Sequence, residues 1–397
     1  MPRPRARDVG IVIGELPTGP LNAITDVDGV RVGHATIIEG DGPLAVGRGP
    51  IRTGVTVVMP HGGDVWHDPV FGAPHVLNGN GEMTGLEWAR EAGMVGGAIA
   101  ITNTHSVGVV RDALVAEGIR SQPPGAFYWS LPIVGETWDG MLNDTDGQHV
   151  RAEHVAAAIA AARGGPVAEG NVGGGTGMVC HEFKGGIGTA SRRLGADAGG
   201  WTVGVLVQAN YGRRGLLRID GVPIGLEIPV EDVPSPYAPD RAVHLPGELP
   251  VPTPTGAMNG ARARDGSIII VVATDAPILP HQCRRIAQRA TLGLARAGGV
   301  GATTSGDLVL AFSTGNLGLP PPETPSPGPG VSSVRMLIDK ALDPLFEATV
   351  ESTEEAIVNA LFAAETMTGR DGITAHALPH DRVVEVMRRH GRLRGAA

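Results

Sequence analysis

The sequence predicts an α/β or α+β layered fold, and three observations support this prediction. Short runs rich in valine and isoleucine alternate along the chain with segments of helical periodicity. Strands interleaved with helices are typical of folds in which helices cover a sheet. The chain has 397 residues and an apolar fraction of 42%, which suits a globular protein with a sizeable core. Since only 4% of the residues are aromatic, aliphatic side chains and alanine are expected to fill that core.

The expected elements follow one another in order. The strands are 53–59 (TGVTVVM), 97–101 (GAIAI), 202–208 (TVGVLVQ), 267–274 (SIIIVVAT) and 307–312 (DLVLAF). The helices are 84–92, 109–117, 152–162 and 281–297. A further helix is expected to begin at Ser352, because Ser352 and Glu355 have the spacing of a capping box, and to end near Gly369.

Composition limits the class of partner and the compartment. The net charge of −9 argues against nucleic acid and anionic membrane surfaces as partners. No apolar run approaches the length of a membrane-spanning helix, and the N-terminus lacks the apolar stretch of a signal peptide. The two cysteines, Cys180 and Cys283, exclude a disulfide framework and favour a reducing compartment. A cytoplasmic location is therefore expected, with Cys180 as a small buried residue.

Two proline-rich stretches interrupt the alternation of strands and helices. Residues 229–264 carry eight prolines, and residues 319–330 (LPPPETPSPGPG) form a shorter stretch of the same kind. Both are expected to be extended and exposed, and the longer one to be disordered and chemically inert. The longer stretch ends directly before Asp265, Gly266 and Ser267, so the strand 267–274 has no strand pattern on its preceding side.

Ser267 has two interpretations. In the first, Asp265 and Gly266 form a turn before a buried strand. In the second, the chain is cut between Gly266 and Ser267, and Ser267 becomes an N-terminal nucleophile whose own α-amine is the base. An α-amine has an ordinary pKa of about 7.7–8.0, so hydrolysis is expected to slow below about pH 7. Glycine suits such a cut because it tolerates a distorted backbone, but spacing alone favours the turn.

Two further segments carry candidate site residues. Ser305 and Asp307 lie at the start of the strand 307–312 and could orient the nucleophile and its ammonium form. Asn210 follows the strand 202–208 and could donate to a developing oxyanion. Each of these residues, taken alone, is also compatible with a simple turn.

Two other patterns are not interpreted as ligand sites. The glycine-rich stretch 170–177 lacks the spacing of nucleotide-binding loops, so a closely packed backbone beside a site is expected there. His61, Asp64, His67 and His75 are irregularly spaced, which favours surface or packing roles over metal binding. Neither a metal nor another cofactor is expected.

A series of motifs resembles the self-processing D-aminopeptidase/β-aminopeptidase family, also described as L-aminopeptidase/D-esterase. The resemblance covers nearly the whole chain and implies an αββα sandwich, with two central sheets flanked by helices. It further implies one catalytic unit over 1–397, cut into chains 1–266 and 267–397, and a homo-oligomer of the cleaved pairs. The motifs are GPLNAITDV (19–27) with VGH (32–34), VLNGNGE (76–82), TNTHSVG (102–108), ETWDG (136–140), NVGGGTG (171–177) and GS (266–267) with ATDAP (273–277).

The resemblance assigns roles to the candidate residues. It implies Ser267 as the nucleophile after cleavage of the bond to Gly266. It implies Ser305 and Asp307 as the hydroxyl and carboxylate partners of that nucleophile, and Asn210 as the oxyanion-binding amide.

Two residues of the ETWDG motif complete the expected site. Trp138 stands where some family members have tyrosine, and an indole N–H can donate a hydrogen bond but cannot ionise. Trp138 is therefore expected to help bind the oxyanion but not to act as an acid. Glu136 is the candidate partner for the free amino group of a substrate.

The function expected from these residues is that of a self-cleaving N-terminal-serine aminopeptidase, amidase or esterase. It would act on short peptides, amides or esters through an acyl-enzyme. Two alternatives stay open: an acyl transferase like the ornithine acetyltransferases, whose nucleophile is threonine, and a non-catalytic protein of the same fold that binds a small ligand.

Overall fold

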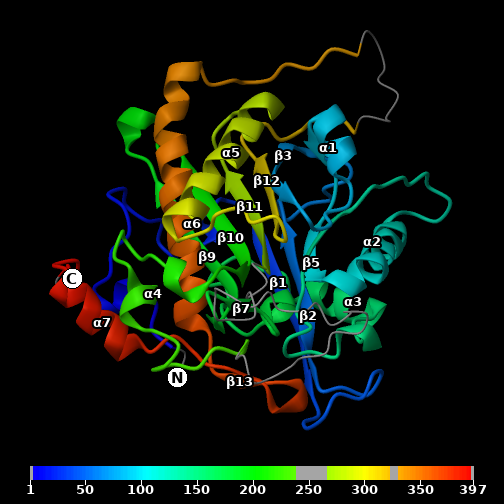
Figure 1. The fold of residues 1–397 in the computed structure, drawn as a ribbon. Helices are drawn as coiled ribbons and strands as arrows, with labels where there is room; N and C mark the ends of the chain where they lie inside the picture. The colour runs from blue at the N-terminus through cyan, green and yellow to red at the C-terminus, as the bar shows by residue number, and fades with distance from the viewer. Residues whose placement is uncertain (1–2, 238–265, 322–329, 395–397) are drawn as a thin grey trace.

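The computed structural model of the chain describes residues 3–237, 266–321 and 330–394. Over these ranges two sheets stack face to face, with one pair of long helices outside each sheet (Figure 1). The layers therefore run helix, sheet, sheet, helix, which confirms the expected αββα sandwich. Most of the longer proline-rich stretch and part of the shorter one lie outside the described residues.

The larger sheet has six strands in the order β4-β3-β12-β11-β10-β9. The pair β11–β12 is parallel, and the other neighbours are antiparallel. In sheet order the strands are Met94–Val95, Val70–Gly79, Gly306–Ser313, Gly266–Thr274, Thr202–Tyr211 and Gly186–Arg193.

The smaller sheet has four strands in the order β1-β2-β5-β6, of which β5 and β6 are parallel. In sheet order they are Arg31–Glu39, Ile51–Met59, Ile99–Asn103 and Ile133–Thr137. Two short hairpins accompany the sandwich: β7 (Val179–Cys180) with β8 (Phe183–Lys184), and β13 (Met367–Thr368) with β14 (Thr374–Ala375).

Helices close both outer faces. The helices α5 (Pro280–Arg296) and α6 (Asp343–Ala363) pack on the larger sheet, and α2 (Val107–Ser121) and α3 (Ala152–Ala161) pack on the smaller one. Shorter helices are α1 (Leu86–Ala92), α4 (Ile224–Glu227) and α7 (His380–Arg389). None of the helices in the described ranges is long and apolar enough to cross a membrane. Cys180 and Cys283 are both buried and free.

The central strand β11 shows how the sequence encodes its position. Ile268 and Ile270 contact the core beneath the helices, whereas Ile269 and Val271 contact the core between the two sheets. Because both faces are buried, the strand is a continuous apolar run and does not alternate with polar residues. Side chains two residues apart share a face, so Ser267 lies on the Ile269 side, between the sheets.

The prediction that a helix begins at Ser352 is wrong. Helix α6 begins at Asp343, nine residues earlier, has proline in its first turn and ends at Ala363. Ser352 and Glu355 are buried in its interior and form no capping box. The carboxylate of Glu355 instead pairs with Arg7 and Arg192, two partners that are distant in sequence.

Candidate active site

Ser267 is the second residue of β11, at the end of the strand that opens toward the loop before β12. Its side chain is buried, and its Oγ accepts a hydrogen bond of 3.0 Å from the backbone N–H of Gly306. Parallel pairing of β11 with β12 brings this donor beside the hydroxyl, because Ile268 pairs with Asp307. The nucleophile candidate is thus held by the backbone of a neighbouring strand.

Gly266 occupies a position that only glycine fits. Its φ of +50° lies in the left-handed region, which L side chains rarely adopt. An ideal Cβ at this position would stand 1.8 Å from the carbonyl oxygen of Asn210. The residue before Ser267 is therefore pressed against the neighbouring strand without room for a side chain.

Ser305, just before β12, and Asp307, the second residue of β12, contact each other. The Ser305 hydroxyl donates to Asp307 Oδ2 at 2.6 Å, and both residues are buried. The loop that carries Ser305 is held by the end of β3 and the residue that follows it. Asn78 Nδ2 donates to the carbonyl of Ser305, and Asn80 Nδ2 donates to that of Thr304 at 2.8 Å. These anchors come from the VLNGNGE segment, whose asparagines could have been read from the sequence as loop-holding residues.

Asn210 lies directly opposite Ser267 in the antiparallel ladder of β10 and β11. Its Oδ1 accepts from the Val179 N–H at 2.8 Å, and its Nδ2 donates to the Trp138 carbonyl at 2.9 Å. These two backbone contacts fix which end of the carboxamide is the donor. Within the described ranges they occupy one of the two Nδ2 hydrogens, which leaves the other for a ligand oxygen.

Trp138 reaches the site through its backbone. Its carbonyl receives the Asn210 bond, while its partly buried indole packs against a small apolar cluster that includes Leu142 and Val179. The ring also lies over Gly140, where an ideal Cβ would stand 2.3 Å from an indole carbon. The role of the indole N–H toward an oxyanion stays a prediction.

Glu136 lies on β6, across the gap between the two sheets. Its side chain is buried, Oε1 accepts from the Glu82 N–H at 2.9 Å, and Oε2 accepts from the Thr104 hydroxyl. Burial raises the pKa of Glu136, and the two hydrogen bonds oppose that rise. A cationic group placed beside this carboxylate would favour its charged form.

Gly81 connects Glu136 to the rest of the site. An ideal Cβ at Gly81 would stand 3.0 Å from the Gly306 Cα and 3.1 Å from Glu136 Oε1. The carboxylate is therefore close to the residue whose N–H holds Ser267 Oγ. All the predicted site residues thus gather at one end of the two sheets, and Gly306, Gly81 and Thr104 are members that sequence reasoning missed.

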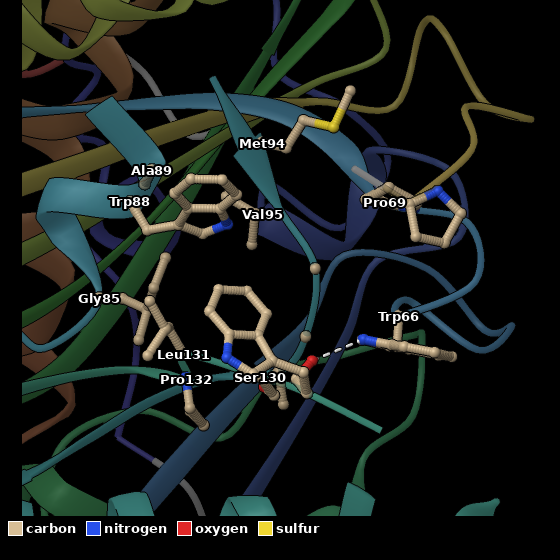
Figure 2. A pocket seen from close by; sticks show the side chains of 16 residues that line it. Trp66, Pro69, Gly85, Trp88, Ala89, Met94, Val95, Ser130, Leu131 and Pro132 are labelled. Carbon is tan, nitrogen blue, oxygen red and sulfur yellow. Dashed lines mark hydrogen bonds between the residues drawn. The ribbon is translucent and has the colours of Figure 1, made fainter. Parts of the chain in front are cut away.

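A separate pocket lies away from this cluster (Figure 2). Its lining includes Trp66, Trp88 and Trp129, and the Trp66 indole donates to the Trp129 carbonyl at 2.7 Å. It borders Ile133, at the start of β6, whereas Glu136 is near the end of that strand. The lining residues of this pocket in the described ranges carry no ionisable side chain, in contrast to the cluster around Ser267.

Comparisons with known proteins identify the family of the chain. Residues 22–375 match the model of peptidase family S58. The chain is 47% identical over 393 residues to β-peptidyl aminopeptidase BapA of Sphingosinicella microcystinivorans, covering 99% of this chain and 94% of that relative.

Solved structures give the same result. A Burkholderia sp. β-aminopeptidase is 51% identical with a TM-score of 0.86, covering 98% of this chain and 99% of that one. The L-aminopeptidase D-Ala-esterase/amidase of Ochrobactrum anthropi, a serine aminopeptidase with a variant of the Ntn hydrolase fold, is 42% identical with a TM-score of 0.83. That similarity covers 99% of this chain and 100% of the other. On the match to the family model and on these similarities, the chain belongs to peptidase family S58.

Proposed function

We propose that Ser267 is the nucleophile of this enzyme and is released as an N-terminal residue when the bond to Gly266 is cut. Membership of family S58 makes the protein a hydrolase of the aminopeptidase class. The observation that carries the assignment to Ser267 is its setting. It accepts from the Gly306 N–H, lies opposite the Asn210 carboxamide and follows a position that excludes every side chain.

The cut itself would use the same hydroxyl. Ser267 Oγ attacks the Gly266 carbonyl, a C–O bond forms, the C–N bond breaks, and the nitrogen of Ser267 becomes a free amine. Water then hydrolyses the ester and leaves a carboxylate on Gly266. Gly266 suits this step, because glycine adopts the left-handed conformation without strain and fits where no side chain has room. The products are chains 1–266 and 267–397, which remain one αββα unit.

Hydrolysis of a substrate would repeat this chemistry. The Ser267 hydroxyl attacks the substrate carbonyl, and the α-amine takes the proton and returns it to the leaving amine. The free Nδ2 hydrogen of Asn210 stabilises the oxyanion, with the Trp138 indole as a second donor. The pair Ser305–Asp307 orients the nucleophile and its ammonium form. Water then releases the acyl group.

Glu136 would bind the free amino group of the substrate. Its carboxylate is buried, held by two donors and close to Gly306, so an ammonium group there would gain a charge-assisted hydrogen bond. This contact would restrict hydrolysis to the N-terminal end of short peptides, amides or esters.

Denaturing mass spectrometry of the purified protein tests the cut. Two fragments that meet at Gly266 and Ser267, both absent from the Ser267→Ala variant, would support the proposal. An intact chain that hydrolyses substrate at full rate would overturn it. Transfer of the acyl group to ornithine in place of water would favour the acyl transferase, and an intact, inactive chain would favour a ligand-binding protein.

We also propose that cleaved pairs associate as a homo-oligomer in a reducing compartment such as the cytoplasm. Three apolar side chains are exposed beside the pocket of Figure 2: Phe127 (68%), Trp129 (38%) and Leu131 (40%). Exposed apolar clusters of this kind are typical of protein interfaces. Light scattering should give a multiple of the chain mass, which Trp129→Ser should reduce. A reducing compartment suits a protein with two free thiols, and cell fractionation tests this location.

A further inference from the structure

Lys184, in the short strand β8, is a buried cation without an acidic partner in the described part of the chain. Its side chain is fully buried, and Nζ donates to the backbone carbonyls of Gly175 at 3.3 Å, Met178 at 2.9 Å and Gly185 at 2.8 Å. Burial lowers the pKa of Lys184 to about 7, and the neighbouring Cys180 opposes that shift. Burying an ammonium group without a counter-charge costs free energy, so a lysine at this position points to a functional role.

The Met178 carbonyl belongs to the same peptide group as the Val179 N–H. Lys184 Nζ donates to one end of this peptide, and the other end donates to Asn210 Oδ1 at 2.8 Å. The Asn210 carboxamide in turn donates through Nδ2. The hydrogen bonds therefore run in one direction, from the ammonium group through a peptide and the Asn210 carboxamide to the Trp138 carbonyl. Ser267 lies opposite Asn210 in the β10–β11 ladder.

We propose that Lys184 is a positioning residue for the oxyanion site and acts through the 178–179 peptide on Asn210. This inference rests on the proposed role of Asn210 in hydrolysis. Donation to the Met178 carbonyl polarises the peptide, which makes the Val179 N–H a stronger donor and the Asn210 amide hydrogens more positive. The same contacts hold the Gly175–Met178 turn in place, so the carboxamide is fixed before a substrate arrives.

A double-mutant cycle between Lys184 and Asn210 tests the proposal. Activity is measured as kcat and KM on an amino acid amide, per cleaved chain as counted by mass spectrometry. We expect Asn210→Ala to lower kcat about 100-fold or more, as loss of an oxyanion donor does. Lys184→Met should lower kcat about 10- to 100-fold with KM nearly unchanged, as loss of a supporting partner does. In the Asn210→Ala background the same Lys184→Met change should cost less than about three-fold, because the two residues act as one unit.

Two further variants separate this role from general support of the fold. Lys184→Gln keeps one amide donor and should retain more kcat than Lys184→Met; it also replaces Lys184→Met in the cycle if that variant does not fold. Thr36→Val removes a different contact to the same glycine-rich loop, where the Thr36 hydroxyl accepts from the Gly173 N–H at 2.8 Å. Its effect should be the same with and without Asn210.

The outcomes are distinguishable. Equal losses from Lys184→Met in both backgrounds, or no loss at all, would overturn the role of Lys184 and leave that of Asn210 intact. Unchanged kcat in Asn210→Ala would overturn both this inference and the oxyanion assignment. Strong coupling to Asn210, with no coupling of Thr36, would support the relay.

Discussion

Asn210 and Ser267 are directly paired residues of the β10–β11 ladder, so the amide and the hydroxyl share one face of the larger sheet. β11 is also paired with β12 on its other side. A cut before Ser267 would therefore leave the new N-terminus anchored between two strands. The bond between Gly266 and Ser267 would be broken, but the pairing of β11 with β10 and β12 would still hold the site residues in place.

Replacing Gly266 with alanine should slow self-cleavage at least ten-fold. The new Cβ would meet the Asn210 carbonyl at 1.8 Å, and φ of +50° is unfavourable for alanine by about 1–2 kcal/mol. A time course of intact mass measures the cleaved fraction. Gly221→Ala is the matched control, because Gly221 has a φ of +77° with nothing within 4 Å of an ideal Cβ. Equal cleavage rates in both variants would contradict the steric argument.

Removing the Ser305 hydroxyl should lower kcat about 10- to 100-fold, the range seen when a supporting hydrogen bond of a site is lost. Asp307 Oδ2 would lose the bond that it accepts at 2.6 Å. Steady-state kinetics of Ser305→Ala on a short amide measures the loss. Thr304→Ala, a hydroxyl deletion at the exposed neighbouring residue, should keep normal kcat. A normal rate in Ser305→Ala would remove Ser305 from the site.

Neutralising Glu136 should weaken the binding of substrates that carry a free amine. A hydrogen bond to a charged group contributes about 1.5–3 kcal/mol, so Glu136→Gln should raise KM about 10- to 100-fold. Glu82→Gln removes the same charge from the exposed neighbour whose backbone N–H holds Glu136, and it should leave KM unchanged. Similar KM values for both variants would exclude Glu136 as the amine-binding residue.

Glu354, on α6, should make stability depend on pH. Burial raises its pKa from 4.5 to about 7, and Arg296, 3.7 Å away, opposes the rise. Between these two pH values the folded protein holds a proton that the unfolded chain releases. The stability from that proton is present below pH 4.5 and is lost as pH rises through 7. Relative to wild type, Glu354→Gln should therefore gain about 3 kcal/mol in free energy of unfolding between pH 4 and pH 8.

Glu355, the next residue, provides the opposite control. Burial favours its neutral form, but the hydrogen bond and charge of Arg7, the charge of Arg192 and the Asn22 amide outweigh burial and lower the pKa of Glu355. Its stabilisation is present above its ordinary value of 4.5 and is lost as pH falls through the lowered pKa. Glu355→Gln should hence be most destabilising near neutral pH. Urea unfolding between pH 3 and pH 8 checks both variants, and parallel curves for the two would contradict the assignment.

Several elements could be predicted from the sequence because the signal is local. The apolar run 267–274 and the run 307–312 form β11 and β12 nearly as expected, and the helix 281–297 agrees with α5 within one residue at each end. By contrast, β1, β3, β6 and β9 were not predicted. Their runs mix glycine, proline and charged residues, and pairing with neighbouring strands is what makes them strands.

The start of α6 shows a second limit. Ser352 and Glu355 have capping-box spacing, but their side chains are interior to a longer helix that begins at Asp343. Glu351 and Glu355 of this helix are tolerated in the core because Arg7 and Arg192 pair with them. A capping box forms only where a helix begins, and an ion pair with residues that are distant in sequence can override the pattern.

The apolar runs of the sequence determined a layered α/β or α+β class and offered Ser267 as a nucleophile candidate. The motifs that resemble a known family implied the αββα arrangement and the roles of the partner residues. Both signals are properties of neighbouring residues. Only the tertiary structure decided that Gly266 has no room for a side chain, that Gly81 brings Gly306 close to Glu136, and that Lys184 lies behind Asn210. These relationships join residues from different strands and loops. Strand register and side-chain packing set such distances, and no local pattern in the chain records them.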